Sequence, residues 1–275
     1  MAFCGKLIRS GGNAKTIKGD KASEYETAIM YLAPYTSAGG ANVCPMAETA
    51  KCIEGCLNTA GRAGLFEAIP AARKRKTQQY LNNRKQFLQD LVSDIEAFAR
   101  YCARKGVKPA VRLNGTSDIQ WERGHAVELK CGGPIKGERF TLPFTSIMAA
   151  FPEVQFYDYT KIPQRLLRGQ LPANYTLTLS YSGASAFYAE QVVQTAKKTG
   201  CNVAVVFRSK AQVARMVSRV HHDGLFPLPS IDGPVYASVI DGDLTDLRFL
   251  DPKGVVVALY AKGKAKKDTS GFVVD

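Results

Sequence analysis

Seven short apolar segments that alternate with helical or loop stretches constrain the fold of this chain more than any other feature. The alternation of such strands with helices predicts βαβ units and a parallel sheet that is covered on both faces. The number and length of the segments predict an α/β fold in which the sheet forms a complete or partial (β/α) barrel, with an open doubly wound sheet as the alternative. The predicted strands are 28–33, 110–114, 154–159, 175–180, 202–207, 235–240 and 255–260, with helices at 185–199 and 210–220 between them.

The chain has 275 residues, of which 45% are hydrophobic, so it can bury the core of one large domain. We place that domain at 28–261, between an N-terminal extension (1–27) and a basic C-terminal tail (262–275). The longest apolar run, 255–261, is too short to cross a bilayer. The first residues lack the apolar core of a signal peptide. These features predict a cytoplasmic protein without a membrane partner.

The chain carries 37 Lys and Arg against 24 Asp and Glu, a formal net charge of +13 that favours a polyanionic partner such as nucleic acid. Much of the excess falls on 71–105, where apolar residues recur at helical spacing and predict one long amphipathic helix. Basic side chains in its first half are candidates for contacts with phosphates, although a solvated helix face would have the same composition. These residues are Arg73, Lys74, Arg75, Lys76, Arg84 and Lys85.

Three of the seven cysteines lie close together, in a predicted loop over 34–66. Cys44, Cys52 and Cys56 have the spacing C-x7-C-x3-C. Thiolates grouped in this way are typical metal ligands. A closed zinc site needs a fourth ligand, which no neighbouring histidine supplies. A cluster held by three cysteines leaves one iron open to an external ligand. The spacing therefore predicts a metal centre and leaves both metals possible.

Polar residues follow several of the predicted strands. The carboxyl ends of parallel strands form the working face of α/β folds, so these residues are candidates for a site. The residues at these strand ends include Asn114, Thr116, Ser117, Asp118, Ser180 and Asp241. Acid–base or phosphate contacts are assigned to Lys161, Tyr159 and Asp118.

A strand at 28–33, a long loop with three cysteines, a helix and further β/α units resemble the layout of radical S-adenosylmethionine enzymes. The strand ends NGTSDI (114–119) and YTK (159–161) are similar to edge motifs of that superfamily, which includes lyases acting on DNA photoproducts. The common spacing there is C-x3-C-x2-C, which differs from the spacing here. A stretch C-P-x-A-x4-C-x3-C before a basic helix is also similar to phage-encoded proteins of unassigned function.

The resemblance implies that Cys44, Cys52 and Cys56 hold a [4Fe–4S] cluster whose open iron chelates S-adenosylmethionine. It also implies that this cofactor is bound by residues at the strand ends, namely Asn114, Thr116, Ser117, Asp118, Ser180 and Asp241. One-electron cleavage of this cofactor would give a 5′-deoxyadenosyl radical that takes a hydrogen atom from nucleic acid or a nucleotide-derived substrate. An electron donor would be a further partner. For a phage-encoded protein the compartment would be the host cytoplasm.

Two other functions remain open. One is a non-enzymatic nucleic-acid-binding protein that zinc stabilises. The other is a Mg²⁺-dependent nuclease, because hard cations prefer clustered carboxylates such as those of Asp241, Asp243 and Asp246.

Overall fold

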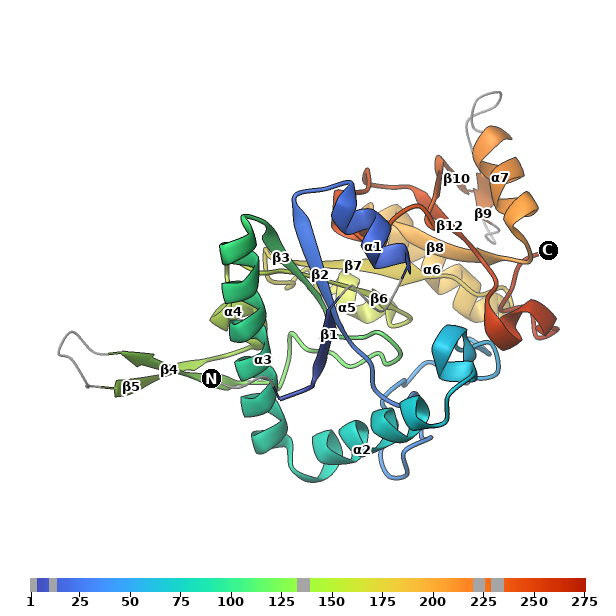
Figure 1. Cartoon of the computed structure of the whole chain (residues 1–275). Helices are drawn as coiled ribbons and strands as arrows, with labels where there is room; N and C mark the ends of the chain where they lie inside the picture. The colour runs from blue at the N-terminus through green and yellow to red at the C-terminus, as the bar shows by residue number, and fades with distance from the viewer. Residues whose placement is uncertain (1–3, 10–13, 133–138, 220–225, 229–234) are drawn as a thin grey trace.

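An eight-stranded sheet forms the centre of the computed structural model, which describes residues 4–9, 14–132, 139–219, 226–228 and 235–275 (Figure 1). All neighbouring strands are parallel except β1 and β2, which are antiparallel. The predicted α/β class and mostly parallel sheet are therefore confirmed. In sheet order the strands are β1 (Leu7–Arg9), β2 (Tyr25–Met30), β3 (Lys108–Arg112), β6 (Gln155–Thr160), β7 (Tyr175–Ser180), β8 (Val203–Phe207), β12 (Val256–Tyr260) and β11 (Val239–Asp241).

Six of the parallel strands, from β2 to β12, lie in the sheet in the same order as in the chain. A doubly wound sheet would reverse this order at a switch point. Parallel crossovers are right-handed, so an unreversed order keeps the connecting helices on one face of the sheet. Because these six strands are all parallel, their carboxyl ends lie along a single edge of the sheet.

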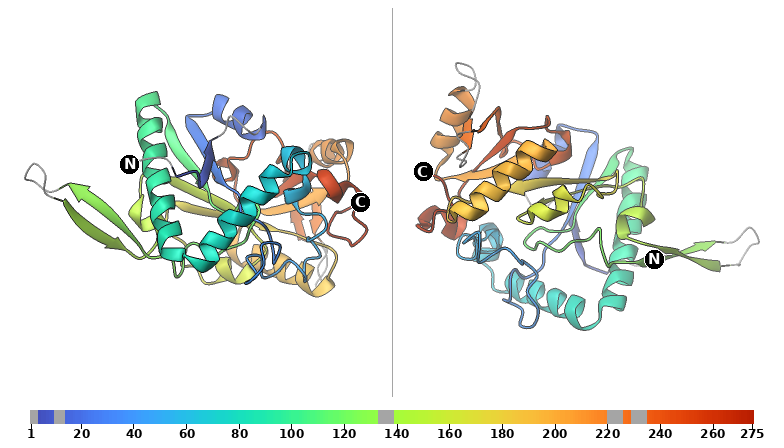
Figure 2. Two further views of the ribbon diagram at one scale, coloured as in Figure 1. Left: turned by 60° about the horizontal axis from the view of Figure 1, so that its bottom comes forward. Right: turned by 180° about the vertical axis from the view of Figure 1, so that it is seen from behind.

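Seven α-helices are described, and two of them, α3 (Arg84–Lys105) and α6 (Ala186–Thr199), bury apolar faces against the sheet (Figure 2). Phe87, Leu91 and Ile95 of α3 are fully buried in one core cluster, whereas Val192 and Val193 of α6 belong to a second. The helices are α1 (Ala14–Lys21), α2 (Ala68–Asn82), α3 (Arg84–Lys105), α4 (Ile147–Ala150), α5 (Pro163–Leu167), α6 (Ala186–Thr199) and α7 (Lys210–Arg219). None of the helices in the described ranges has the length and apolar content needed to span a bilayer.

The predicted helix over 71–105 is two helices, because the chain leaves helical geometry at Asn83, with φ −141° and ψ 60°. Asn82 and Asn83 are adjacent at this break. Asparagine is unfavourable in helix interiors, because its side chain forms local hydrogen bonds that favour helix ends. The predicted end at Gly106 is confirmed: this residue adopts the left-handed conformation, φ 70°, that caps many helices.

Two antiparallel hairpins were not predicted. β4 (Val127–Gly132) and β5 (Arg139–Phe144) form one of them, which projects from the body of the molecule (Figures 1 and 2). β9 (Phe226–Leu228) and β10 (Val235–Ala237) form the other. The predicted strand over 235–240 is therefore divided between β10 and β11.

Both segments that flank the predicted domain are part of its fold. β1, in the N-terminal extension, pairs with β2. In the C-terminal segment, a 3₁₀ turn (Gly263–Lys267) is followed by Phe272 and Val273, which are buried. Val274 then bridges to Phe207 of β8. The segment 262–275 therefore packs along its length onto the strand end of β8 and the cysteine loop.

Candidate functional site

The cysteine loop, residues 31–67, follows β2 at the carboxyl edge of the sheet. Cys44, Cys52 and Cys56 are all half-buried free thiols. Burial raises the pKa of all three, that of Cys44 to about 12, and Cys56 and Cys52 add to the increase at Cys44. The three sulfurs therefore share one electrostatic neighbourhood. Among the described residues, no three His, Cys, Asp or Glu side chains are arranged to hold a single metal ion.

Backbone contacts fix the orientation of each thiol. The Cys44 Sγ accepts a hydrogen bond from Tyr35 N at 3.3 Å and lies 3.9 Å from the Thr116 carbonyl oxygen. The Cys52 Sγ donates to Ala47 O at 3.8 Å. The Cys56 Sγ accepts from Asn58 N, as the N-cap of a 3₁₀ turn (Leu57–Thr59).

Two cations lie near the thiols and affect their pKa values. Lys161, directly after β6, donates a hydrogen bond from Nζ to Ser180 Oγ at 2.7 Å. Burial lowers the pKa of Lys161, while Cys52 and Asp118 act against that decrease. Arg73 of α2 donates to Asn58 Oδ1 at 2.6 Å and lies 4.7 Å from the Tyr31 ring centroid. Burial also lowers the pKa of Arg73, against the effect of Tyr31 and Cys56.

Asp118 connects the loop after β3 to the end of β6. Its carboxylate accepts hydrogen bonds from Thr160 Oγ1, Lys161 N and Arg165 Nη1 at 2.7–3.0 Å. Burial raises its pKa, although Arg165 opposes this increase. Asp118 therefore lies next to Lys161, and its hydrogen bonds are with the protein itself.

Asn114 organises the same loop through five hydrogen bonds. Its Oδ1 accepts from Ser117 Oγ, Ile119 N and Trp121 Nε1 at 2.9–3.0 Å. Its Nδ2 donates to Ile119 O and to Asp158. Thr116 Oγ1 in turn donates to Leu32 O at 2.5 Å. The predicted cofactor residues Asn114, Thr116 and Ser117 thus come together, and they shape the loop that contacts Cys44.

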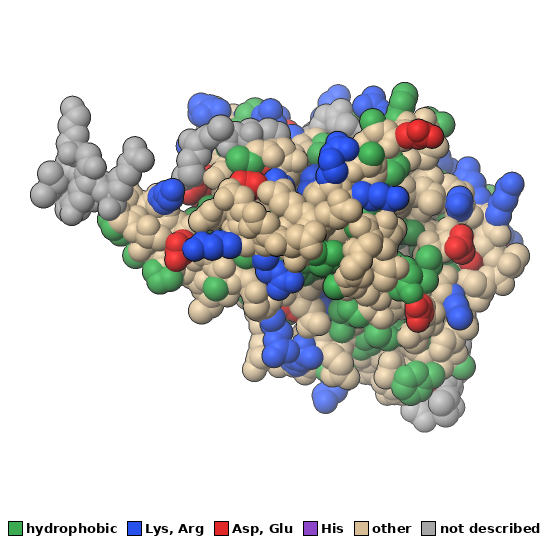
Figure 3. All heavy atoms as spheres, turned by 90° about the horizontal axis from the view of Figure 1, so that it is seen from below, with side chains coloured by type: hydrophobic (Ala, Val, Ile, Leu, Met, Phe, Trp, Pro, Cys, Tyr) green, Lys and Arg blue, Asp and Glu red, His purple; other side chains and the backbone are tan. Residues whose placement is uncertain are grey.

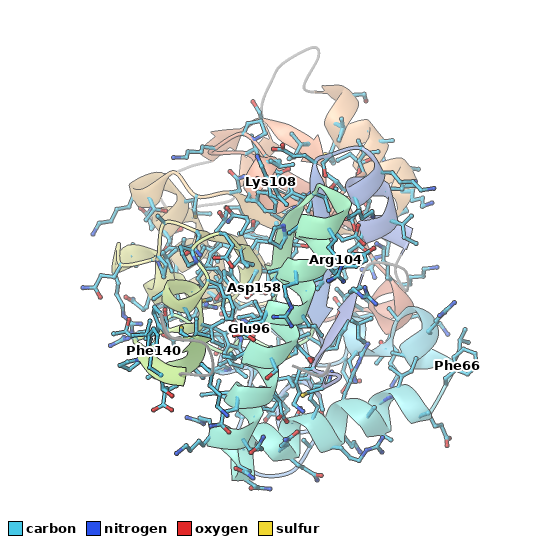
Figure 4. All side chains as sticks on the ribbon, turned by 60° about the vertical axis from the view of Figure 1, so that its left-hand side comes forward. Phe66, Glu96, Arg104, Lys108, Phe140 and Asp158 are labelled. Atoms are coloured by element: carbon cyan, nitrogen blue, oxygen red, sulfur yellow. The ribbon has the colours of Figure 1, made fainter. Side chains whose placement is uncertain are left out.

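A buried ion network beneath this loop was missed from the sequence. The guanidinium of Arg165 is fully buried and pairs with Asp118 at 3.0 Å and Glu122 at 2.7 Å. It also donates to Tyr175 Oη at 2.8 Å, and this hydroxyl donates to Asp158 Oδ2 at 2.8 Å. Burial raises the pKa of Asp158 to about 7. Figure 4 shows Asp158 in the interior behind α3, whereas Phe66 and Phe140 lie at the periphery. The sequence signal that could have indicated this network is Asp158, a charged residue within the otherwise largely apolar strand 154–159.

A second polar cluster, also missed from the sequence, contains the predicted residue Tyr159. Arg112 pairs with Asp246 at 3.1 Å, and its guanidinium lies 4.7 Å from the Tyr159 ring centroid. The hydroxyls of Tyr159 and Thr178 and part of the Arg248 guanidinium are buried and have no hydrogen-bond partner in the described part of the chain. Buried donors without a partner are rare, so this cluster is suited to a bound acceptor or water.

The three aspartates proposed for magnesium have separate partners. Asp243 accepts from Lys262 Nζ at 2.7 Å and Tyr260 N at 2.9 Å, and Asp246 pairs with Arg112. Asp241 accepts a local bond from Asp243 N. Asp241 lies on β11, separated from β3 by four strands in the sheet. The structure does not bring Asp241 next to the other predicted cofactor residues by strand pairing.

The basic residues predicted to contact phosphates do not form one surface. Lys76 is half-buried and donates from Nζ to Lys6 O at 2.8 Å, and burial lowers its pKa to about 8. Arg73 faces the cysteine loop. Only four of the six are exposed, and the helix break separates them: Lys74 and Arg75 on α2, and Arg84 and Lys85 on α3. Figure 3 shows Lys and Arg side chains in several separate groups on the lower face.

Comparison with known proteins gives one family. The model of the family described as Gene product 88 matches residues 6–275, nearly the whole chain. No curated protein matches, and no solved structure matches. The description of the family names no activity, and it is compatible with the predicted phage origin.

Proposed function

This chain belongs to the Gene product 88 family, and we propose that it is a radical S-adenosylmethionine-type iron–sulfur protein that acts on nucleic acid or a nucleotide-derived substrate. The observation that carries the proposal is the position of the three thiols. They lie in the loop after the first parallel strand, next to Lys161 and Asp118 at the ends of the following strands. We also infer that the six strands from β2 to β12 curve into a partial barrel, which the unreversed strand order supports.

The chemistry of the donor set fits an iron–sulfur cluster. Buried thiols with raised pKa values ionise readily only when a cation compensates them. In a [4Fe–4S] cluster each cysteine binds a different iron, so its sulfurs lie farther apart than those that bind one zinc ion.

Cys44, Cys52 and Cys56 would hold the cluster, which supplies one electron for reductive cleavage of S-adenosylmethionine. Lys161 and Arg73 place positive charge beside three thiolates, which lowers the cost of burying them. The Asn114 and Asp118 hydrogen bonds hold the β3 loop against Cys44 and Lys161. Ser180 orients the Lys161 ammonium.

The Tyr159 and Thr178 hydroxyls, which have no hydrogen-bond partner among the described residues, would orient a substrate acceptor group. A one-electron donor is a necessary partner of this chemistry. We place the reaction in the cytoplasm, because a reducing compartment keeps such thiols free.

Anaerobic purification followed by iron, sulfide and zinc analysis tests the proposal. We expect brown protein with about four iron and four sulfide per chain. Single Cys→Ala changes at 44, 52 and 56 should each reduce both contents, whereas Cys201→Ala, in a half-buried cysteine at the end of α6, should not. Added reductant and S-adenosylmethionine should then yield 5′-deoxyadenosine.

Colourless protein with one zinc per chain would overturn the proposal in favour of a zinc-stabilised binding protein. Mg²⁺-dependent cleavage of DNA by iron-free protein, abolished by Asp243→Ala, would overturn it in favour of a nuclease. Equal iron in all four cysteine variants would also contradict it.

A further inference from the structure

We propose that a pocket beside the cysteine loop binds the phosphate of a nucleotide unit, through Arg84, Arg123 and Arg168. The pocket has a volume of about 390 Å³. Four segments that are distant in the chain form it: the cysteine loop at 41–45, the junction of α2 and α3, the loop after β3, and the end of α5. That the bound nucleotide is the substrate rests on the proposed function, whereas the phosphate-binding site itself does not.

The three arginines give the pocket a positive charge that the protein does not neutralise. All three are exposed, and none forms an ion pair with an acidic side chain in the described part of the chain. Arg84 lies 4.7 Å from the Tyr80 ring centroid, and Arg168 donates one hydrogen bond to Gln120 Oε1. A guanidinium has five N–H donors, so most of these donors are available.

The other titratable side chains of the lining leave that charge in place. Asp118 is the acidic residue among them, and its carboxylate already accepts from Thr160, Lys161 and Arg165. His125 is neutral near pH 7, because burial lowers its pKa to about 4. The lining therefore offers several cationic donors on different sides and no free carboxylate.

Phosphate is the anion that this arrangement fits. Guanidinium groups bind phosphate oxygens through paired N–H donors, and arginines from several segments can surround a tetrahedral anion. A pocket of this size accommodates one nucleotide unit. The neutral and aromatic residues beneath, Tyr80 and His125, are buried and serve as its floor.

The position of the pocket connects it to the cysteine site. Val43 and Pro45, the two neighbours of Cys44 in the chain, line it. Val43 O also accepts a hydrogen bond from Asp118 N at 2.9 Å. A phosphate bound there would hold the rest of its nucleotide within reach of the cysteine loop.

Charge-matched double variants test the site. Arg123→Gln with Arg168→Gln removes two charges from the pocket, and Lys74→Gln with Arg75→Gln removes two exposed charges from α2 outside it. Binding of a fluorescent single-stranded dT oligonucleotide is measured by anisotropy over a salt series. The pocket variant should bind about tenfold or more weakly, with a salt slope smaller by about 1.4 for two lost contacts. The α2 variant should bind within about twofold of the wild type.

Thymidine monophosphate and inorganic phosphate serve as competitors. Displacement of the oligonucleotide by either supports a phosphate site. Binding of the monophosphate alone, lost in the pocket variant, assigns the site to a free nucleotide. Equal weakening by both double variants, or no binding of any probe by the wild type, overturns the proposal. Iron content should be unchanged in the pocket variant, so failure here is distinguishable from failure of the proposed iron–sulfur function.

Discussion

Lys161 and Cys52 shift each other's pKa in opposite directions: the ammonium lowers that of the thiol, and the thiol raises that of the ammonium. Burial acts against both effects, since it disfavours each charged form. Together the pair is therefore more readily charged than either group would be alone. This relationship joins the end of β6 to the cysteine loop.

Lys161→Met should decrease the iron content of anaerobically purified protein several-fold. The substitution keeps the length of the side chain and removes the charge that compensates the thiolates. Lys161→Arg should keep most of the iron, and Lys74→Met, at an exposed position of α2, should keep all of it. Wild-type iron content in the Lys161→Met variant would show that the ammonium does not support the metal centre.

Arg165→Met should decrease the free energy of unfolding by about 3–5 kcal/mol. The change leaves the buried carboxylates of Asp118 and Glu122 without their shared cation. Arg100→Met is the control, because the Arg100–Glu96 pair is half exposed at 3.9 Å, and its loss should cost less than about 1 kcal/mol. Urea unfolding of metal-free protein measures both. A small effect at Arg165 would mean that the two carboxylates are protonated or solvated.

Thr178→Val should leave the unfolding free energy unchanged or raise it by about 0.5–1 kcal/mol. The hydroxyl is buried without a hydrogen-bond partner, and valine has the same shape and suits a strand. Thr195→Val should instead destabilise α6, because Thr195 Oγ1 donates to Gln191 O at 2.7 Å. Destabilisation by Thr178→Val of more than about 1 kcal/mol would indicate a bound water or other acceptor at this hydroxyl.

Acid should destabilise the region around His125. Its pKa is lowered in the folded state, so the protein loses stability as the pH falls from about 6.5, the unfolded value, towards about 4. Trp121, the only tryptophan, lies 4.6 Å from the His125 ring and reports the change by fluorescence. His125→Gln should abolish the fluorescence transition in this pH range. Persistence of the transition in that variant would assign it to another group.

The sheet could be predicted because its strands are apolar runs bounded by polar residues. The predicted strand over 175–180 agrees with β7 at both ends, and those over 154–159 and 202–207 agree within one residue. The first strand lies three residues earlier than predicted, since Tyr25 and Glu26 continue the pairing with β3. The local pattern of apolar residues indicates which residues are buried, whereas the residues at which a strand begins and ends depend on its pairing with neighbouring strands.

The hairpin of β4 and β5 was missed although Val127, Leu129 and Cys131 alternate with polar residues. The predicted strands are apolar runs typical of strands buried on both faces, whereas this hairpin is largely exposed along one side. Its alternation has the period of a strand with one buried face.

The position of the cysteine loop after the first parallel strand could be read from the sequence, but the partners of its residues could not. Asp118 and Arg165 are 47 residues apart, and Arg112 and Asp246 are 134 apart. No local spacing connects such pairs. They meet because parallel strands bring their carboxyl ends to one edge, which only the folded sheet defines.

The packing of the C-terminal segment has a consequence for how the thiols become enclosed. A side chain at Gly55, next to Cys56, would meet the Phe272 ring at 2.8 Å, and Ser270 Oγ donates to Lys51 O, next to Cys52. During synthesis, this cover reaches the loop only after some 200 further residues have left the ribosome. A nascent or prematurely terminated chain therefore leaves the turn between Cys52 and Cys56 without this cover. Affinity tags and fusion partners belong at the opposite terminus.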